Sequence, residues 1–365
     1  MQFIDLKTQY KSMEKEIDAA MKKVLEHGQY INGPEITELE KTLADYVGAK
    51  HGIVCSSGTD ALLMALMAIG VKAGDEVITT PFTFIATAEV IALLGAVPVF
   101  VDIDEKTYNL NPGLIKKKIT PKTKAIMPVS LYGQCADFDA INDVARAHGI
   151  AVIEDAAQSF GATFKGKKSC ALTEISCTSF FPSKPLGAYG DGGAMFTNDD
   201  AHAKLIKQIR EHGQDRRYNH PVLGLNARMD SLQAAILLTK MKYFPAEVAA
   251  REKIGKRYSE LLKGVAVTPF IAEGNTSVYA QYTIQVERRE GFLEKMKEAG
   301  VPTAVHYPIP LHLQPVFAYL GEGKGSYPIS EQIAERVVSL PMHPYLSEPE
   351  QDEVVAAIKK SIVNG

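Results

Sequence analysis

Short β-branched segments alternate with helical segments over much of the first half of the chain. The run "HGIVC" precedes the apolar helical pattern "DALLMALMAI", and the run "VITT" follows it. The alternation continues through "IATAEVIALLGA", "VPVFVDID", "DFDAINDVARAHGI" and "AVIED". Strands that alternate with helices in this way form βαβ units, whose parallel strands are covered by helices. The sequence therefore predicts an α/β fold with a mostly parallel central sheet flanked by helices.

The pattern changes twice in the second half. Two strand-like runs, "CTSFFPS" and "GGAMFTN", follow each other directly, and a helical block is expected from about Ala201 to Leu262. From about Lys263, the runs "VYAQYTIQV", "GFLEKMKEAG" and "EQDEVVAAIKKSIV" are typical of a smaller α+β unit. A length of 365 residues also favours two domains. We therefore expect an N-terminal segment with a large α/β domain over residues 1–245, and a small C-terminal α+β domain over residues 246–365.

The charge balance and the cysteines argue against several classes of protein. A net charge of −3 argues against nucleic acid or an anionic membrane as the main partner. No apolar run approaches the ~18 residues of a membrane span, and the amphipathic start is unlike a secretory signal. Cys55, Cys135, Cys170 and Cys177 show no C-x-x-C spacing. We therefore expect a cytoplasmic protein with reduced thiols, without disulfides and without a cysteine metal site.

Lys184 has unusual neighbours for a lysine. It lies in "SFFPSKPLGAYGDGGA", between an apolar strand-like run and a glycine-rich turn that lets backbone approach another group closely. On local context alone, the commoner interpretation is a strand-end lysine with its amine in solvent. The alternative is a desolvated amine that forms a Schiff base.

Polar residues also follow other predicted strands, where ligands bind in open α/β sheets. In "CSSGTDAL", Gly58 and Thr59 start a helix, whose N–H groups either bind a phosphate or are simply capped by a hydroxyl. In "AVIEDAAQ", the carboxylate of Glu154 or Asp155 either pairs with a bound cation or caps the next helical turn. Gln158 would face the same way on that turn.

Three further stretches hold candidate residues. Phe84, in "TPFTFIA", is either a core residue, which is the commoner role, or an aromatic plate for a planar ligand. Asn226 and Arg228, in "GLNARMDSLQAA", would project to one side of an extended segment, or would form a turn with a solvated arginine. His306 and His312 lie among prolines without a nearby acidic or cysteine partner, so no metal is expected there.

Together these residues supply the parts of one ligand site: N–H groups, a carboxylate, an aromatic plate and an amine. Pyridoxal 5′-phosphate (PLP) needs this set. Its phosphate binds N–H donors, its pyridine nitrogen needs an acidic partner, and its aldehyde reacts with an amine. We therefore expect PLP as the cofactor and Lys184 as the residue that forms the Schiff base.

The chain also resembles a known family. The motifs "GPEITELE", "CSSGTDALLMAL", "VITTPFTFIATAEVI", "EDAAQSFGA", "SFFPSKPLGAYGDGGA", "GLNARMDSLQAA" and "LPMHP" appear in this order. They resemble the DegT/DnrJ/EryC1/StrS family of sugar aminotransferases over nearly the whole chain. The resemblance implies PLP fold type I, which is the aspartate aminotransferase type, and a homodimer with shared active sites. Pro185 departs from the asparagine that is common in the family after the lysine.

The resemblance implies a role for each matching residue. Lys184 and Asp155 would be catalytic, with Lys184 on the cofactor aldehyde and Asp155 on the pyridine nitrogen. The other cofactor-binding residues would be Gly58, Thr59, Phe84, Gln158, Ser179 and, from the neighbouring subunit, Asn226. The sugar-binding residues would be Gly28, Tyr30, Ser183, Arg228, His306 and Tyr307.

The implied reaction transfers an amino group from glutamate to a keto nucleotide sugar. One subset of the family has histidine in place of the lysine and dehydrates its substrate, so Lys184 favours transamination. The start "MQFIDLKTQY" resembles the branch that acts on UDP-2-acetamido-2-deoxy-3-oxo-glucuronate for bacterial surface polysaccharide (O-antigen) synthesis. Three alternatives remain: a different substrate, which would be a 4-keto or another 3-keto nucleotide sugar or a keto-inositol; a regulatory protein that binds the cofactor without turnover; and a structural α/β protein.

Overall fold

A central sheet of seven strands organises the chain, whose residues 1–363 are described by a computed structural model. The strand order is β1-β9-β8-β5-β4-β2-β3. Neighbours pair in parallel from β8 to β3, whereas β9 runs antiparallel to β8 and β1. The predicted, mostly parallel sheet is therefore confirmed. Its strands are β1 (His51–Cys55), β2 (Glu76–Thr79), β3 (Val97–Phe100), β4 (Thr123–Ile126), β5 (Ala151–Asp155), β8 (Ile175–Ser179) and β9 (Gly193–Thr197).

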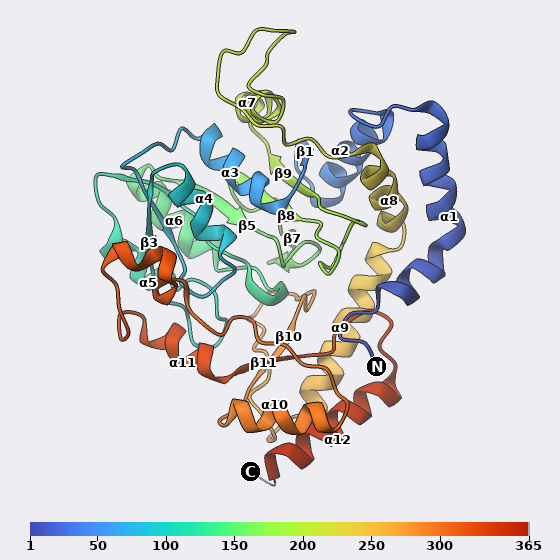
Figure 1. The fold of residues 1–365 in the computed structure, drawn as a ribbon. Helices are drawn as coiled ribbons and strands as arrows, with labels where there is room; N and C mark the ends of the chain where they lie inside the picture. The colour runs from blue at the N-terminus through green and yellow to red at the C-terminus, as the bar shows by residue number, and fades with distance from the viewer. Residues whose placement is uncertain (364–365) are drawn as a thin grey trace.

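Helices cover both faces of the sheet (Figure 1). Successive residues of β1 show this, because side chains alternate between the faces of a strand. Ile53 packs in one apolar cluster with α3 and α7, and Val54 packs in another with α2 and α8. On the first face lie α3 (Gly58–Ala68), α4 (Ala86–Leu93) and α7 (Asp200–Arg210), and on the second lie α2 (Pro34–Val47), α6 (Phe138–His148) and α8 (Ser231–Met241).

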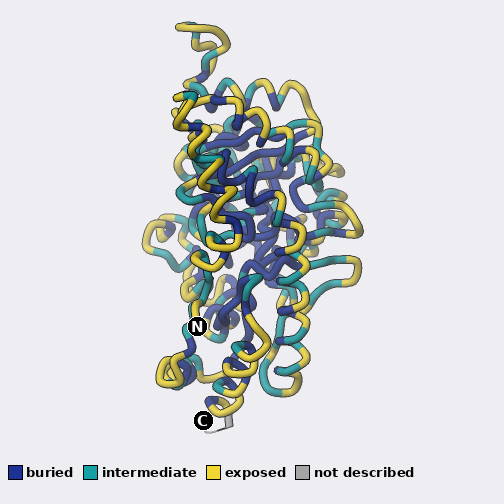
Figure 2. The backbone as a smooth tube through the Cα atoms, turned by 90° about the vertical axis from the view of Figure 1, so that its right-hand side faces the viewer, coloured by how far each residue is buried: buried dark blue, intermediate teal, exposed yellow. Residues whose placement is uncertain are grey.

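Helix α3 illustrates how the sequence sets this arrangement. Its residues are apolar around most of the helix, so it is stable only between the sheet and other helices. The long helix α1 (Leu6–His27) is instead amphipathic and buries Met13 and Ile17 against Ile236 of α8. Figure 2 shows the resulting core, in which buried segments run through the interior and exposed segments lie at the rim.

The C-terminal part has its own apolar cluster. This cluster includes Ile254 on α9 (Phe244–Leu261) and Ile358 on α12 (Glu348–Val363). In the same part, β10 (Tyr282–Gln285) pairs antiparallel with β11 (Val337–Leu340). Two further helices of this part are α10 (Arg289–Glu298) and α11 (Pro328–Arg336). We propose that this part is the small domain of residues 246–365, with the boundary in the first turn of α9.

The predicted helical block is wrong between α7 and α8. Residues 211–230 contain no helix, and the arm formed by residues 211–225 projects beyond α7 at the top of Figure 1. Its glycines explain the break. Gly213 has φ +71°, and a Cβ there would lie 1.8 Å from the Val222 carbonyl oxygen. On this arm, Tyr218 and Leu223 are 80% and 87% exposed.

Shorter elements complete the fold. They are α5 (Pro112–Ile115), β6 (Thr163–Phe164), β7 (Lys167–Lys168) and four 3-10 turns over Lys116–Lys118, Leu131–Gly133, Leu311–Leu313 and Pro315–Leu320. The four cysteines are buried free thiols. Within residues 1–363, no helix combines the length and apolar character needed to cross a membrane.

Candidate active site

Asp155 ends strand β5 at the carboxyl edge of the parallel sheet. Its side chain is buried and accepts two hydrogen bonds, from the Thr87 hydroxyl at 2.8 Å and from the Ala157 amide at 3.1 Å. Burial raises the pKa of Asp155, while these hydrogen bonds and the charge of Lys184 oppose the rise. Residues 156–161 form turns and no helix, so Asp155 caps a turn and not the helix considered above.

Glu154 has different partners from Asp155, because successive side chains of a strand point to opposite faces. It is fully buried and accepts hydrogen bonds from the hydroxyls of Ser130 and Ser169 and from the Cys170 amide. Burial raises the pKa of this carboxyl as well. Glu154 therefore ties neighbouring loops together, and Asp155 is the carboxylate available to the candidate site.

Lys184 lies on a tight turn after β8, and its amide donates to the Phe181 carbonyl at 2.8 Å. The side chain is half-buried, and its amine makes no hydrogen bond or ion pair to another residue of the described chain. Burial lowers the pKa of Lys184, and the attraction of Asp155 partly opposes this. The desolvated alternative therefore agrees with the environment of this amine. Ser183 precedes it on the same turn and is also half-buried.

Gln158 links three segments around the Asp155 carboxylate. Its side-chain oxygen accepts from the Tyr132 amide at 2.7 Å, and its side-chain nitrogen donates to the Tyr307 hydroxyl at 3.0 Å. The ring of Tyr307 lies 6.1 Å from that of Phe84, centroid to centroid. Phe84 is 53% exposed, so it is not a core residue and offers an open ring face.

His306 lies beside Tyr307 and close enough to Lys184 for their charges to interact. Its Nδ1 atom is 2.9 Å from the Ser339 hydroxyl, and its carbonyl accepts a hydrogen bond from the Tyr132 hydroxyl. Burial, reinforced by the positive charge of Lys184, lowers the pKa of His306 to about 4. This imidazole is therefore neutral at physiological pH.

The start of α3 approaches the end of β8. A Cβ on Gly58 would lie only 2.6 Å from the Cβ of Ser179, so a side chain there would push the two segments apart. Ser57 is the N-cap, and its hydroxyl accepts from the Asp60 amide at 3.0 Å. Capping is thus confirmed for Ser57, and the first turn, with Gly58 and Thr59, remains beside Ser179.

A second group of predicted residues gathers around the segment before α8. Ala227 and Met229 are buried, while Asn226 and Arg228 lie on the more exposed side, as an extended segment requires. The Arg228 guanidinium donates to Glu211 at 3.3 Å. Arg228 also borders a cavity of about 470 Å³ that is lined by Ser56, Ser57, Asp60, Gly190, Asp191, Met229, Asp230 and Gln233.

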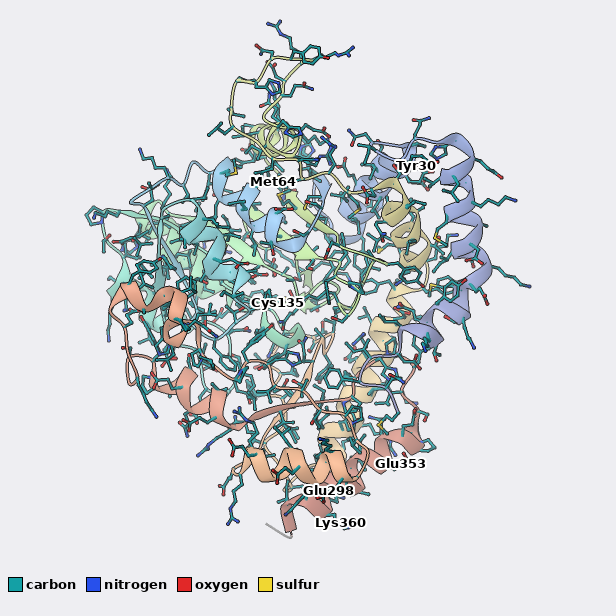
Figure 3. The ribbon with its side chains drawn as sticks, in the orientation of Figure 1. Tyr30, Met64, Cys135, Glu298, Glu353 and Lys360 are labelled. Atoms are coloured by element: carbon teal, nitrogen blue, oxygen red, sulfur yellow. The ribbon has the colours of Figure 1, made fainter. Side chains whose placement is uncertain are left out.

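Gly28 and Tyr30 belong to this second group. Gly28 ends α1 with φ +69°, and the Tyr30 carbonyl accepts from the Ser231 amide at 2.9 Å. Tyr30 is half-exposed and lies beside α2 in Figure 3, whereas the labelled Cys135 lies deep in the chain. In the described part of the chain, no hydrogen bond or ion pair joins this group to Lys184 or Asp155.

Two contributors were missing from the predicted site. Thr87 donates to Asp155, and the Tyr132 amide donates to Gln158. In the sequence, the only signal for Thr87 is a threonine inside the apolar run "IATAEVI", which is weak, and a backbone amide such as that of Tyr132 leaves no signal at all.

His306 and His312 have separate partners, since the Nε2 atom of His312 is 3.0 Å from Glu331. Within residues 1–363, no three histidine, cysteine or acidic side chains are arranged to hold a metal.

Comparison with known proteins places the chain in a family. The model of the DegT/DnrJ/EryC1/StrS aminotransferase family matches residues 11–359. Over 359 residues, the chain is 59% identical to the UDP-2-acetamido-2-deoxy-3-oxo-D-glucuronate aminotransferase of Pseudomonas aeruginosa, covering 98% of this chain and 99% of that one. It is 47% identical to a pleiotropic regulatory protein of Geobacillus stearothermophilus, covering 97% and 96% of the two chains.

Solved structures share the fold. Streptomyces venezuelae DesV, in complex with a ketimine intermediate, is 37% identical with a TM-score of 0.97, covering 98% of this chain and 97% of that one. NtdA of Bacillus subtilis, with bound cofactor PMP, is 33% identical with a TM-score of 0.91, covering 99% and 83%. These similarities confirm the expected fold class. Because the family match also spans nearly all of its length, the chain belongs to the DegT/DnrJ/EryC1/StrS aminotransferase family.

Proposed function

We propose that this protein is a PLP-dependent aminotransferase that moves an amino group from glutamate to UDP-2-acetamido-2-deoxy-3-oxo-glucuronate. The observation that carries the proposal is the half-buried Lys184 amine, which has no partner in the described chain and interacts electrostatically with Asp155. The choice of sugar is supported by the 59% identity to the P. aeruginosa enzyme of that name. By the same resemblance, we propose a cytoplasmic enzyme of O-antigen synthesis.

The residues present fit PLP. The N-terminus of α3 favours an anion, and Gly58 lets it approach Ser179, so these residues with Thr59 would hold the phosphate. Phe84 would stack on the pyridine ring, and Gln158 would contact the side of the ring that bears the hydroxyl. When bound, PLP withdraws electrons from the substrate carbon that loses a proton.

Asp155 would hold a proton on the pyridine nitrogen. Its buried carboxylate is kept in place by Thr87 and by the Ala157 amide, so it needs little rearrangement to accept a hydrogen bond from that nitrogen. Burial strengthens this interaction because the local dielectric constant is low.

Lys184 would carry the proton at the substrate carbon. Burial lowers the pKa of the amine, so a larger fraction is neutral and able to accept a proton than for a lysine in water. The ammonium group formed in this way would then act as the proton donor. The neutral imidazole of His306 and the hydroxyl of Tyr307 would orient the sugar beside it.

Gly28, Tyr30 and Arg228 would bind the sugar in a homodimer, where each site also receives Asn226 from the other subunit. Within one chain, this group is not bonded to the Lys184 group, and the arm beside it exposes the large side chains of Tyr218 and Leu223. A two-fold axis can bring such separated groups together. Arg228 suits the carboxylate of a uronic acid, because a guanidinium pairs with it bidentately.

The test is amino transfer by the purified protein. Incubation with PLP, glutamate and a panel of keto nucleotide sugars should give 2-oxoglutarate and the amine of the 3-oxo-glucuronate substrate. A 4-keto sugar as the better acceptor would refute the proposed substrate and leave the chemistry intact. Borohydride should trap PLP on Lys184, and Lys184→Ala should remove the adduct while the exposed Lys165→Ala control keeps it.

A second candidate is a regulatory protein that binds PLP without turnover. It is favoured by the name of the G. stearothermophilus relative, which shares 47% identity with the chain. The absorbance spectrum separates the two functions. Glutamate should convert the visible band of an aminotransferase to the shorter-wavelength band of the aminated cofactor, whereas a binding protein without turnover would keep its spectrum.

A further inference from the structure

Lys240 on α8 is a lysine buried in the interior, with 1% of its surface exposed. Its amine donates to the Gly187 carbonyl at 2.6 Å and lies 4.2 Å from the centroid of the Tyr189 ring. No carboxylate of the described chain lies within ion-pair distance of it. A buried ammonium is costly unless it is well partnered. An apolar residue would pack here without that cost, so the presence of a lysine calls for a reason.

The two partners of Lys240 belong to the turn that carries Lys184. The turn closes where the Ala188 amide donates to the Phe180 carbonyl at 2.7 Å. Gly187 lies just inside this closure, and a Cβ there would come 2.3 Å from the Pro182 carbonyl oxygen. The turn is therefore folded tightly on itself, and the Gly187 carbonyl is directed toward α8.

A second side chain of α8 holds the same turn. The Gln233 side-chain oxygen accepts from the Tyr189 amide at 2.8 Å, and its nitrogen lies 3.4 Å from the Tyr189 carbonyl. Gln233 and Lys240 are about two helical turns apart, which places them on one face of α8. This face therefore fixes the returning half of the turn at Gly187 and Tyr189.

We infer that Lys240 is a positioning residue, whose ammonium group holds the Gly187 carbonyl and thereby fixes the turn that presents Lys184. This inference rests on the proposed function, in which Lys184 is the reacting amine. Burial lowers the pKa of Lys240 to about 8, against the attraction of Glu247. The amine is therefore mostly charged at neutral pH and donates a strong hydrogen bond.

The test compares Lys240→Met with Lys242→Met. Methionine has a similar length without the charge or the donor, and Lys242 is an exposed lysine at the end of the same helix, paired with Glu16. Hydrogen exchange on the full-length chain without added cofactor should show the Ala188 and Tyr189 amides exchanging about tenfold faster in Lys240→Met only. With PLP and substrates, kcat should fall about tenfold while KM for glutamate stays unchanged. The borohydride adduct should remain on Lys184.

Other results would overturn the inference. A folded Lys240→Met variant with wild-type exchange at these amides and wild-type kcat would show that the lysine has no positioning role. A lower melting temperature with unchanged kcat would show a purely structural role. If the methionine variant does not fold, the same two measurements are made on Lys240→Leu, which also lacks the charge and the donor, and wild-type values again overturn the inference. If the wild-type protein forms no adduct and transfers no amine, the proposed function fails, and the exchange data still decide whether Lys240 holds the turn.

Discussion

The Thr87 hydroxyl donates a 2.8 Å hydrogen bond to Asp155 Oδ2 across 68 positions of sequence, from the first turn of α4 to the end of β5. This bond stabilises the charged form of a buried carboxylate and lowers its pKa. Thr87→Val removes the donor with little change of shape. We expect the acid limb of the kcat/KM pH profile to move to higher pH, because Asp155 is then harder to ionise.

The matched control is Thr79→Val. Thr79 is also buried, but its hydroxyl donates to the Met127 carbonyl and not to Asp155. This variant should keep the wild-type profile. A profile that stays in place in Thr87→Val would contradict the role of this hydrogen bond.

Asp155→Asn should nearly abolish amino transfer while part of the PLP binding remains. An amide cannot supply the negative charge that keeps the pyridine nitrogen protonated, so a loss of about 10²–10⁴ in kcat is expected. Glu154→Gln is the neighbouring control, since that side chain bonds Ser130, Ser169 and Cys170 instead. Its kcat per folded molecule should stay near wild type. Near-normal turnover in Asp155→Asn would rule out the proposed role.

The charge of Lys184 should be detectable at His306. In the protein without PLP, the lysine contributes to lowering the pKa of His306 to about 4. Lys184→Met removes this charge, and the pKa of the imidazole should rise toward 6.5 in an NMR titration of the histidine ring. An unchanged pKa would mean that the two side chains do not share one environment.

The same imidazole should make stability depend on pH. Its folded pKa lies below the ordinary value of 6.5, so between these values only the unfolded chain binds the proton, and stability falls as the pH falls. From pH 7 to pH 4, this group should cost about 2 kcal/mol of unfolding free energy, allowing for partial exposure. Urea unfolding of the wild type and of His306→Asn should differ in their pH dependence by that amount.

Two inactive variants should complement each other if Arg228 acts across a dimer. When Lys184→Ala and Arg228→Ala chains are refolded together, each mixed dimer has one site with both lesions and one with neither. Activity should return on mixing. Lys184→Ala with Asp155→Ala, whose lesions lie on the same side, should stay inactive. Subunit exchange without recovery of activity in the first pair would place Arg228 in the site of its own chain, beside Ser57.

Local patterns predicted the central sheet well, because parallel strands and buried helices are specified by short runs of residues. The runs "CTSFFPS" and "GGAMFTN" likewise predicted β8 and β9 as consecutive strands, and these two strands pair with each other. The prediction of a continuous helical block was wrong at the arm, although the sequence there contains the helix breakers Gly213, Pro221 and Gly224. The predicted block extended across these breakers.

The candidate site was predictable only in part for a different reason. Lys184 and Asp155 could be selected from their flanking strands, since each follows a buried apolar run. The bonds from Thr87 to Asp155 and from Lys240 to Gly187 depend on the three-dimensional packing of α4 and α8. No periodicity within one segment encodes such contacts, so they become visible only once the chain is folded.

The position of β9 between β1 and β8 has a consequence for how the chain folds during synthesis. β1 pairs with β9, from His51 with Thr197 to Cys55 with Gly193. The first strand of the sheet to be synthesised, β1, therefore cannot pair until the last strand, β9, has left the ribosome. Until then, β1 has no partner, and β8 presents a bare edge that is open to pairing with other chains. Prematurely terminated products that end before residue 193 should therefore aggregate, whereas products that end after α8 can already pair β9 with both β1 and β8.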